Sequence, residues 1–365
     1  MKMVSRRYQE ASRLAEMIFL VLFLSFTLLD AAKVLPRTEL RQIAQESTDL
    51  SSLKNHFEQI AVVRVVDSAE HARVGDYIAE TLKLLGLEVS VDEFSQETLV
   101  GRKFFRNIIA DWNPRNANDL IVLSAHYDSK VFDDFPFIAA TDSAMPCAML
   151  LELAEYLTQS VTGDGTEKRQ LQHVGTRFVF FDGEEAFLDW TDDDSLYGAR
   201  HLASLWEQQR ANGQQNNPED AESHPSEDCE KPSTELSRIR YLVLLDLLGG
   251  PASVFYDLYT STSPLYIILS DIEQQYHKLK LFSPRSQRFF SKSRRKLYHV
   301  ASQLKDDHKP FADRGVPTLH VIPVPFGSEW HTEADNADII DYQIVRELTT
   351  IFKAFLLHEV TEPRE

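Results

Sequence analysis

The sequence predicts a single α/β domain with a central, mostly parallel mixed sheet and helices on both of its faces. Four segments, residues 119–128, 177–181, 239–246 and 317–322, are rich in apolar residues, and this composition is typical of strands buried on both faces. Segments with helical spacing of apolar residues alternate with them, as in parallel sheets. The 365 residues, 43% of them hydrophobic, show no repeat and no second core, which favours one domain.

The amino terminus has the pattern of a secretory signal peptide. Arginines at positions 6, 7 and 13 precede an apolar run at 17–29, and small residues follow it. Glu16 and Asp30 bracket that run more closely than the ~20 apolar residues of a membrane span would allow. We therefore expect a signal peptide at 1–32, a catalytic domain at 33–365, secretion and no stable membrane association. An uncleaved anchor in the Golgi membrane is the alternative.

The composition limits the classes of partner. A formal net charge of −18 offers no basic face for phosphates, so nucleic acid is not expected as a partner. The acidity favours cationic ligands, such as peptides with a free amino terminus, although it also fits a role in solubility alone. The two cysteines, Cys147 and Cys229, are too few for a disulfide scaffold, although a single bridge between them is compatible with the sequence. A monomer is expected.

The remaining elements follow from local patterns. Ser68 is a predicted helix cap for 68–85, and the alternating residues 87–94 predict an edge strand paired with 105–111. The polar segment 211–237 is expected to be a disordered surface insertion. Further helices are predicted at 38–53, 148–157, 197–209, 264–279 and 342–359.

The segment 177–190 is the centre of the predicted site. Its apolar run breaks at Asp182 and Gly183 and then presents Glu184 and Glu185. Ligands of open α/β sheets bind beyond the carboxyl ends of the strands. Adjacent carboxylates there suggest that one binds a metal and the other moves protons, although a solvated acidic turn has the same pattern.

Other strands also lead into polar residues at their carboxyl ends. His126 and Asp128 end the first buried strand, Asp246 ends the third, and a loop after the fourth reaches His331. Asp142 lies just before a predicted helix, where it could simply be a helix cap. Asp142, Glu185 and His331 would supply three zinc ligands from three loops and leave a position open. The pattern alone does not prove a metal site, because α/β enzymes commonly collect carboxylates at this edge.

Six motifs, in this order along the chain, together resemble animal glutaminyl-peptide cyclotransferases. They are AHYDSK at 125–130, ATDSAMPCA at 140–148, FFDGEEAF at 180–187, VLLDL at 243–247, DDH at 306–308 and FGSEWH at 326–331. The resemblance extends from about 38 to 358 and lapses in the insertion. It implies the fold of zinc aminopeptidases and the conversion of N-terminal glutaminyl residues of peptides and proteins into pyroglutamate, with slower action on glutamate.

The resemblance also implies a role for each matching residue. It makes Asp142, Glu185 and His331 the ligands of one zinc ion per chain, and Glu184 the general acid/base within a network of Asp246 and Asp306. Trp190, Phe326 and Trp330 would form the pocket for the glutamine side chain, with His320 nearby. Tryptophans are more often packing residues, and His320 could be an ordinary core histidine.

Two departures from the family pattern and two rival functions remain. Ser124 replaces a cysteine that vertebrate members bridge to the counterpart of Cys147, so Cys147 is expected to be a buried free thiol. Lys305 replaces a glutamine before the acidic pair. His126 and Asp246 could join the three predicted ligands to hold two zinc ions, as in a secreted aminopeptidase. A catalytically inactive binding protein is the other rival, but the ligand and base set is intact.

Overall fold

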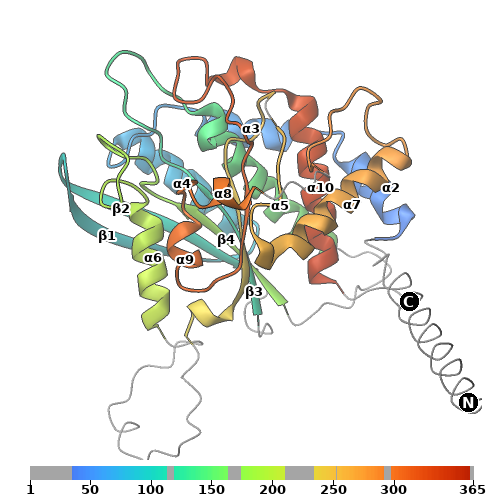
Figure 1. The fold of residues 1–365 in the computed structure, drawn as a ribbon, viewed down its shortest axis with the longest axis horizontal. Helices are drawn as coiled ribbons and strands as arrows, with labels where there is room; N and C mark the ends of the chain where they lie inside the picture. The colour runs from blue at the N-terminus through green and yellow to red at the C-terminus, as the bar shows by residue number, and fades with distance from the viewer. Residues whose placement is uncertain are drawn as a thin grey trace, which may run out of the picture.

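The computed structural model describes residues 35–112, 119–162, 174–209, 234–251, 253–291 and 297–361. Its six strands form one sheet in the order β1-β2-β4-β3-β5-β6 (Figure 1). The pairs β4–β3, β3–β5 and β5–β6 are parallel, whereas β1–β2 and β2–β4 are antiparallel. The strands are β1 (Glu88–Thr98), β2 (Gly101–Trp112), β3 (Asp119–His126), β4 (Val174–Phe181), β5 (Ile239–Leu245) and β6 (Thr318–Val321).

Helices cover both faces of the sheet, as predicted (Figure 1). Successive side chains of a strand point to opposite faces, so Phe178 and Phe180 pack on one side of β4 while Val179 and Phe181 pack on the other. The first face packs against α2 (Arg37–Glu46), α3 (Ser51–Ile60), α4 (Ala69–Leu84), α5 (Met145–Thr162), α7 (Ser263–Lys278) and α10 (Tyr342–Val360). The second packs against α6 (Tyr197–Gln208) and α9 (Lys309–Ala312).

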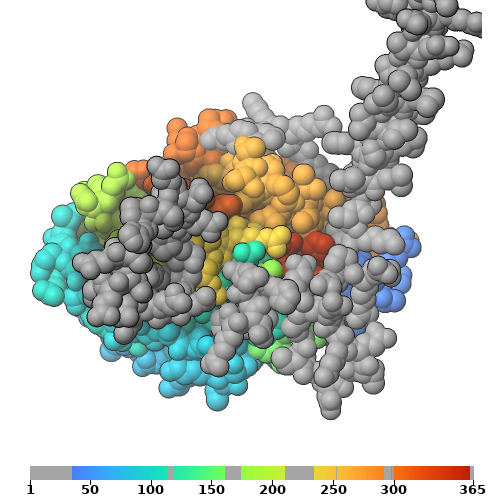
Figure 2. Space-filling model, turned by 90° about the horizontal axis from the view of Figure 1, so that it is seen from below, coloured from blue at the N-terminus to red at the C-terminus, as the bar shows by residue number. Residues whose placement is uncertain are grey.

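The β1–β2 hairpin forms one end of the molecule, and α2 lies near the other (Figures 1 and 2). The hairpin register runs from Glu88 opposite Asp111 to Thr98 opposite Gly101, beyond the predicted end of the first strand. A short helix, α8 (Tyr298–Ala301), contributes Ala301 to a separate small apolar cluster beside Leu247 and Ile322. The four parallel strands β4, β3, β5 and β6 are consecutive in the sheet, so their carboxyl ends lie on the same side of it.

The predicted helix at 38–53 is wrong, because two helices occupy this region. The polar residues between them bond to nearby backbone groups instead: Thr48 Oγ1 donates to the Gln45 carbonyl at 2.7 Å, and Asp49 Oδ1 accepts from the Ser51 N–H at 2.9 Å. Such local bonds compete with helix continuation. The predicted cap of α4 is confirmed, since Ser68 Oγ accepts from the His71 N–H.

Some predictions fall outside the described residues. The predicted signal peptide, Cys229 and most of the predicted insertion belong to this group. The last residues of that insertion, 234–237, are folded: Leu236 is buried in the second apolar cluster. The prediction of an insertion up to residue 237 is therefore wrong at its C-terminal end, because the folded chain resumes by residue 234. Within the described ranges, no helix is long and apolar enough to cross a membrane.

Candidate active site

Four parallel strands deliver polar residues to one edge of the sheet, at their carboxyl ends. His126 is the last residue of β3, β4 is followed by the turn that carries Glu184 and Glu185, and Asp246 directly follows β5. The loop beyond β6 carries His331. The His126, Glu184, Glu185 and Asp246 side chains are all buried. This arrangement is consistent with the prediction from the sequence that these residues lie at the same edge of the sheet.

The turn after β4 is tightly packed. Gly183 has φ +66°, and a Cβ there would lie 2.5 Å from Cε1 of Phe105, so glycine meets both the backbone and the space requirements. The N–H groups at the start of α6 donate to the turn: Leu196 to the Glu184 carbonyl at 2.9 Å and Tyr197 to the Gly183 carbonyl at 2.8 Å. These bonds hold the carbonyl groups of the turn that carries the two glutamates.

Asp142, Glu185 and His331 converge with one ligand atom each within 4.8 Å of the others. His331 Nε2 lies 2.9 Å from Glu185 Oε1 and 3.5 Å from Asp142 Oδ2. Burial disfavours the charged imidazole, but the two carboxylates raise the pKa of His331 to about 10. Two carboxylates and an imidazole around one point match the nitrogen and oxygen donors that zinc takes, so these residues fit a metal ion.

A second set of possible ligands shares Asp142 with the first. His126 Nε2 lies 3.0 Å from Asp142 Oδ1 and 3.5 Å from Asp246 Oδ1, and all three side chains are buried. The residues required for the rival dinuclear arrangement are therefore adjacent in the structure.

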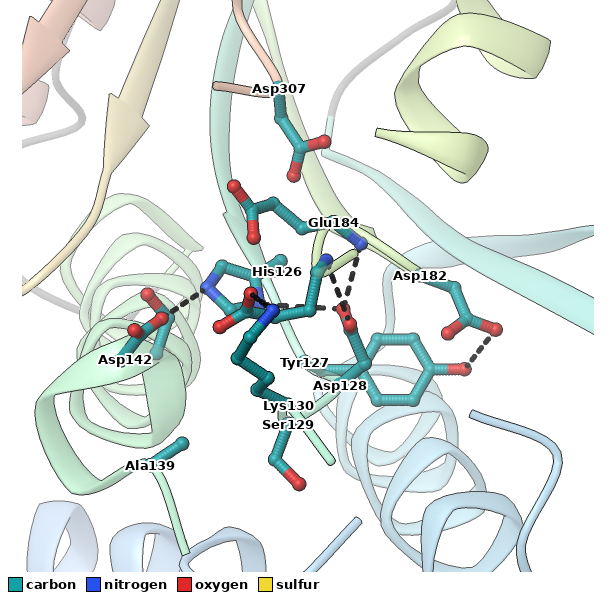
Figure 3. A network of polar contacts seen from close by, with 12 residues as sticks. His126, Tyr127, Asp128, Ser129, Lys130, Ala139, Asp142, Asp182, Glu184 and Asp307 are labelled. Carbon is teal, nitrogen blue, oxygen red and sulfur yellow. Dashed lines mark hydrogen bonds and ion pairs between the residues drawn. The ribbon is translucent and has the colours of Figure 1, made fainter. Parts of the chain in front are cut away.

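Glu184 lies among other acidic groups. Burial raises its pKa well above the usual range, and the charges of Glu185, Asp306 and Asp307 raise it further, although His126 opposes them. Burial and the charge of Asp306 likewise raise the pKa of Asp246 to about 6. Figure 3 shows the Asp307 side chain pointing toward Glu184. Glu184 therefore holds a proton in a pH range where an ordinary glutamate would have lost it.

His320 is paired with one of the acidic residues. Its Nε2 lies 2.7 Å from Asp306 Oδ2, and both side chains are buried. The His308 ring is tilted against the His320 ring, with centroids 4.3 Å apart, and its Nε2 lies 2.6 Å from the Tyr259 hydroxyl. The structure thus places His320 in the polar cluster around Asp306 and not in a purely apolar core.

Two of the predicted pocket aromatics pack together beside His331. The Trp330 ring stacks on the His331 imidazole with centroids 4.2 Å apart, and Phe326 meets Trp330 edge-on at 4.9 Å. Trp330 and Trp190 are 40% and 39% exposed, so both rings are available to a ligand. The loop of Trp190 is tied to the loop of Asp306 by an ion pair of 2.5 Å between Asp192 and Lys305.

Sequence reasoning assigned no role to several residues that the fold brings to the site. Ser143 Oγ donates to Asp246 Oδ1. Lys130 Nζ donates to Glu185 Oε2 at 3.3 Å and to the Ala186 carbonyl at 3.0 Å. Asp307 is fully buried. All three lie inside the quoted motifs, so their position beside predicted site residues was a usable signal.

Cys147 is buried and free, as predicted from the serine at position 124. Its Sγ donates to the His126 carbonyl at 3.1 Å, and burial raises the pKa of the thiol to about 12. Ser124 instead donates to the Val243 carbonyl at 3.2 Å within the sheet. Both side chains are accommodated without a covalent link between them.

The chain is similar to proteins of known family. The signature of peptidase family M28 matches residues 107–356. A glutaminyl-peptide cyclotransferase of Drosophila melanogaster is 39% identical over 85% of this chain and 81% of its own length. One of Dictyostelium discoideum is 36% identical over 85% of this chain and 84% of its own.

The chain is also similar to solved structures. A glutaminyl cyclase of Macrostomum lignano superposes with a TM-score of 0.75 at 35% identity, covering 90% of this chain and 95% of its own. A zinc-dependent exopeptidase of Parabacteroides distasonis, 23% identical, shares the fold with a TM-score of 0.60 over 84% of this chain and 96% of its own. The chain therefore belongs to peptidase family M28 and, within it, to the glutaminyl-peptide cyclotransferases.

Proposed function

We propose that this protein is a zinc-dependent glutaminyl-peptide cyclotransferase that converts N-terminal glutaminyl residues of peptides and proteins into pyroglutamate and releases ammonia. The observation that carries the proposal is the convergence of Asp142, Glu185 and His331 with Glu184 directly beside them. The sequence similarity to cyclotransferases supports it over the larger share of the chain.

Asp142, Glu185 and His331 would hold one zinc ion per chain. Bound there, zinc would supply a Lewis acid for polarising the side-chain carbonyl of the substrate. Lys130 donates to the outer oxygen of Glu185 and so keeps that carboxylate oriented. His126 does the same for Asp142 through the contact at 3.0 Å.

Glu184 would move the proton. The α-amino nitrogen forms a bond to the side-chain amide carbon, and the bond from that carbon to the amide nitrogen breaks. Glu184, starting as a carboxylate, takes a proton from the attacking amine and gives one to the departing nitrogen, so ammonia leaves and the carboxylate is regenerated. Its raised pKa suits both halves of this transfer. Asp246 and Asp306 would form the network that sustains this pKa.

Trp190, Phe326 and Trp330 would form the substrate pocket. Their flat rings would align the five-membered ring closure and exclude water, which would limit competing hydrolysis. His320, which contacts Asp306, would lie close to this pocket and contribute to substrate binding. Peptides that begin with glutamine are the expected partners, and glutamate would react more slowly. We further propose secretion after removal of residues 1–32, a domain at 33–365, and a monomer.

The rival function is a dinuclear zinc aminopeptidase, favoured by the second ligand set of His126, Asp142 and Asp246. The test combines zinc content per chain with the products formed from a glutamine-initiated peptide. One zinc per chain, ammonia and a product blocked at its amino terminus support the cyclotransferase. Two zinc ions and free glutamine released by peptide-bond cleavage would overturn that proposal in favour of the aminopeptidase.

A further inference from the structure

Asp128 lies two residues beyond β3, and its side chain is completely buried. Its Oδ1 accepts from the Glu184 N–H at 3.1 Å, and its Oδ2 accepts from the Glu185 N–H at 3.2 Å (Figure 3). We propose that Asp128 is a positioning residue that sets the backbone of Glu184 and Glu185. The single carboxylate of Asp128 would thereby fix both the proton-transfer group and a metal ligand.

The turn that Asp128 holds has no strand partner of its own. Glu184 and Glu185 lie beyond the last residue of β4, so no sheet ladder fixes their N–H groups. The carbonyls of Asp182, Gly183 and Glu184 accept from the first residues of α6. Asp128 binds the opposite, N–H side of the same turn. The two sets of bonds together leave this segment little freedom to rotate.

Asp128 also reaches a second metal ligand through His126. Its Oδ1 lies 3.3 Å from His126 Nδ1, and His126 Nε2 lies 3.0 Å from Asp142 Oδ1. A displacement of Asp128 would therefore disturb Glu185 through its backbone and Asp142 through His126. Groups of this kind, which orient metal ligands without touching the metal, commonly change metal affinity when they are removed.

The position of Asp128 is itself fixed by both neighbours in the chain. The Tyr127 N–H donates to the Phe181 carbonyl at 2.9 Å, which ties Asp128 to the end of β4. The Ser129 Oγ accepts from the Arg64 N–H at 3.0 Å, and the fully buried Arg64 side chain donates to the Tyr127 carbonyl at 2.7 Å. A rigid base of this kind is what a positioning carboxylate requires.

Asp194 provides a matched control in the same part of the chain. It too is fully buried, and its two oxygens accept from the adjacent N–H groups of Phe187 and Leu188 at 3.0 and 2.8 Å. Those residues contain no proposed metal ligand or proton-transfer group. Asp128→Asn and Asp194→Asn therefore remove the same kind of double acceptor, but only the first lies at the metal site. In each variant the amide oxygen keeps one bond and the NH₂ group opposes the second N–H.

The test measures zinc affinity of metal-depleted protein by competition with a chelator, together with the melting temperature without zinc. We expect the dissociation constant to rise about 10- to 100-fold in Asp128→Asn and less than about threefold in Asp194→Asn, with similar losses of melting temperature. With zinc saturating, kcat of Asp128→Asn should fall more than KM rises. A general packing role would lower melting temperature without this difference in zinc affinity.

The inference rests on the zinc ligands of the proposed function, and the outcomes separate the two. Zinc affinity of Asp128→Asn equal to that of the parent, or an equal loss in Asp194→Asn, would overturn the role of Asp128 alone. Failure of the parent to bind zinc would overturn the proposed function as well. If Asp128→Asn does not fold, Asp128→Glu keeps the charge but displaces it by one methylene, and weakened zinc binding is expected there too.

Discussion

Glu184 and Glu185 are neighbours in the chain but lie in opposite electrostatic surroundings. Glu185 faces the cationic side, with His331 Nε2 at 2.9 Å and Lys130 Nζ at 3.3 Å from its oxygens. Glu184 faces the acidic side, where Asp306 and Asp307 raise its pKa in addition to the effect of burial. Glu185 thus has the cationic neighbours that suit a metal ligand, and the raised pKa of Glu184 keeps that group able to hold a proton. Environment, and not residue type, separates the two roles.

The sharpest test of this difference is to change each glutamate in turn to glutamine. Glu184→Gln should lower turnover about 10²- to 10⁴-fold with zinc retained, because proton transfer is lost while the ligands remain. Glu185→Gln should instead lose zinc. Initial rates of ammonia release and metal analysis of the same samples measure both effects. Loss of zinc from Glu184→Gln would place Glu184 among the ligands and remove the proposed distinction.

Zinc binding can be weakened without changing either glutamate. Asp142→Ala removes one of three predicted ligands and should weaken zinc binding by more than about 100-fold, beyond the usual effect of an outer residue. Chelator competition measures it. Asp134→Ala, an exposed change in the preceding loop, is the control and should leave affinity unchanged. Equal affinity in Asp142→Ala and the parent would exclude Asp142 as a ligand.

Asp306→Asn removes one of the negative charges near Glu184. The charge of Asp306 raises the pKa of both Glu184 and Asp246, so its removal should lower both values. Each group then loses its proton at lower pH, and the acidic limb of the rate–pH profile should move down by roughly one pH unit. Asp192→Asn removes an exposed charge from the ion pair with Lys305 and should leave that limb in place. A shift to higher pH would contradict the assignment.

The smallest expected effect concerns Asp335, whose Oδ1 accepts from the Thr141 N–H at 2.7 Å. Burial and the charge of Asp142 raise the pKa of Asp335 to about 7. Since the folded value exceeds the unfolded value of about 3.9, stability should fall as pH rises between them. Asp335→Asn should reduce the difference in unfolding free energy between pH 5 and pH 8 by about 1–3 kcal/mol.

Urea unfolding of the metal-depleted protein at both pH values measures this difference. Asp341→Asn, at the exposed cap of α10, is the control. If Asp335→Asn and the parent depend on pH equally, the charged form of Asp335 is not disfavoured in the folded state.

The sequence predicted the buried strands and their carboxyl-terminal polar residues well, because both depend on short apolar runs and on chain order. It missed the break between α2 and α3, where the hydroxyl of Thr48 and the carboxylate of Asp49 compete with helical bonds over a few residues. The residue pattern placed Glu185 in the ligand set but contained no physical reason to prefer it over Glu184. That distinction depends on Lys130 and Asp307, which approach from segments far apart in the chain.

Cys147 makes the site accessible to a direct measurement of local opening. Its thiol donates to the carbonyl of His126, lies fully buried, and has a pKa near 12, so alkylating reagents cannot react with it in the closed protein. The rate at which its own peptide becomes labelled therefore counts excursions in which the β3 end separates from α5. Labelling that slows when zinc is added would report, in a single thiol, how strongly metal binding holds the catalytic edge together.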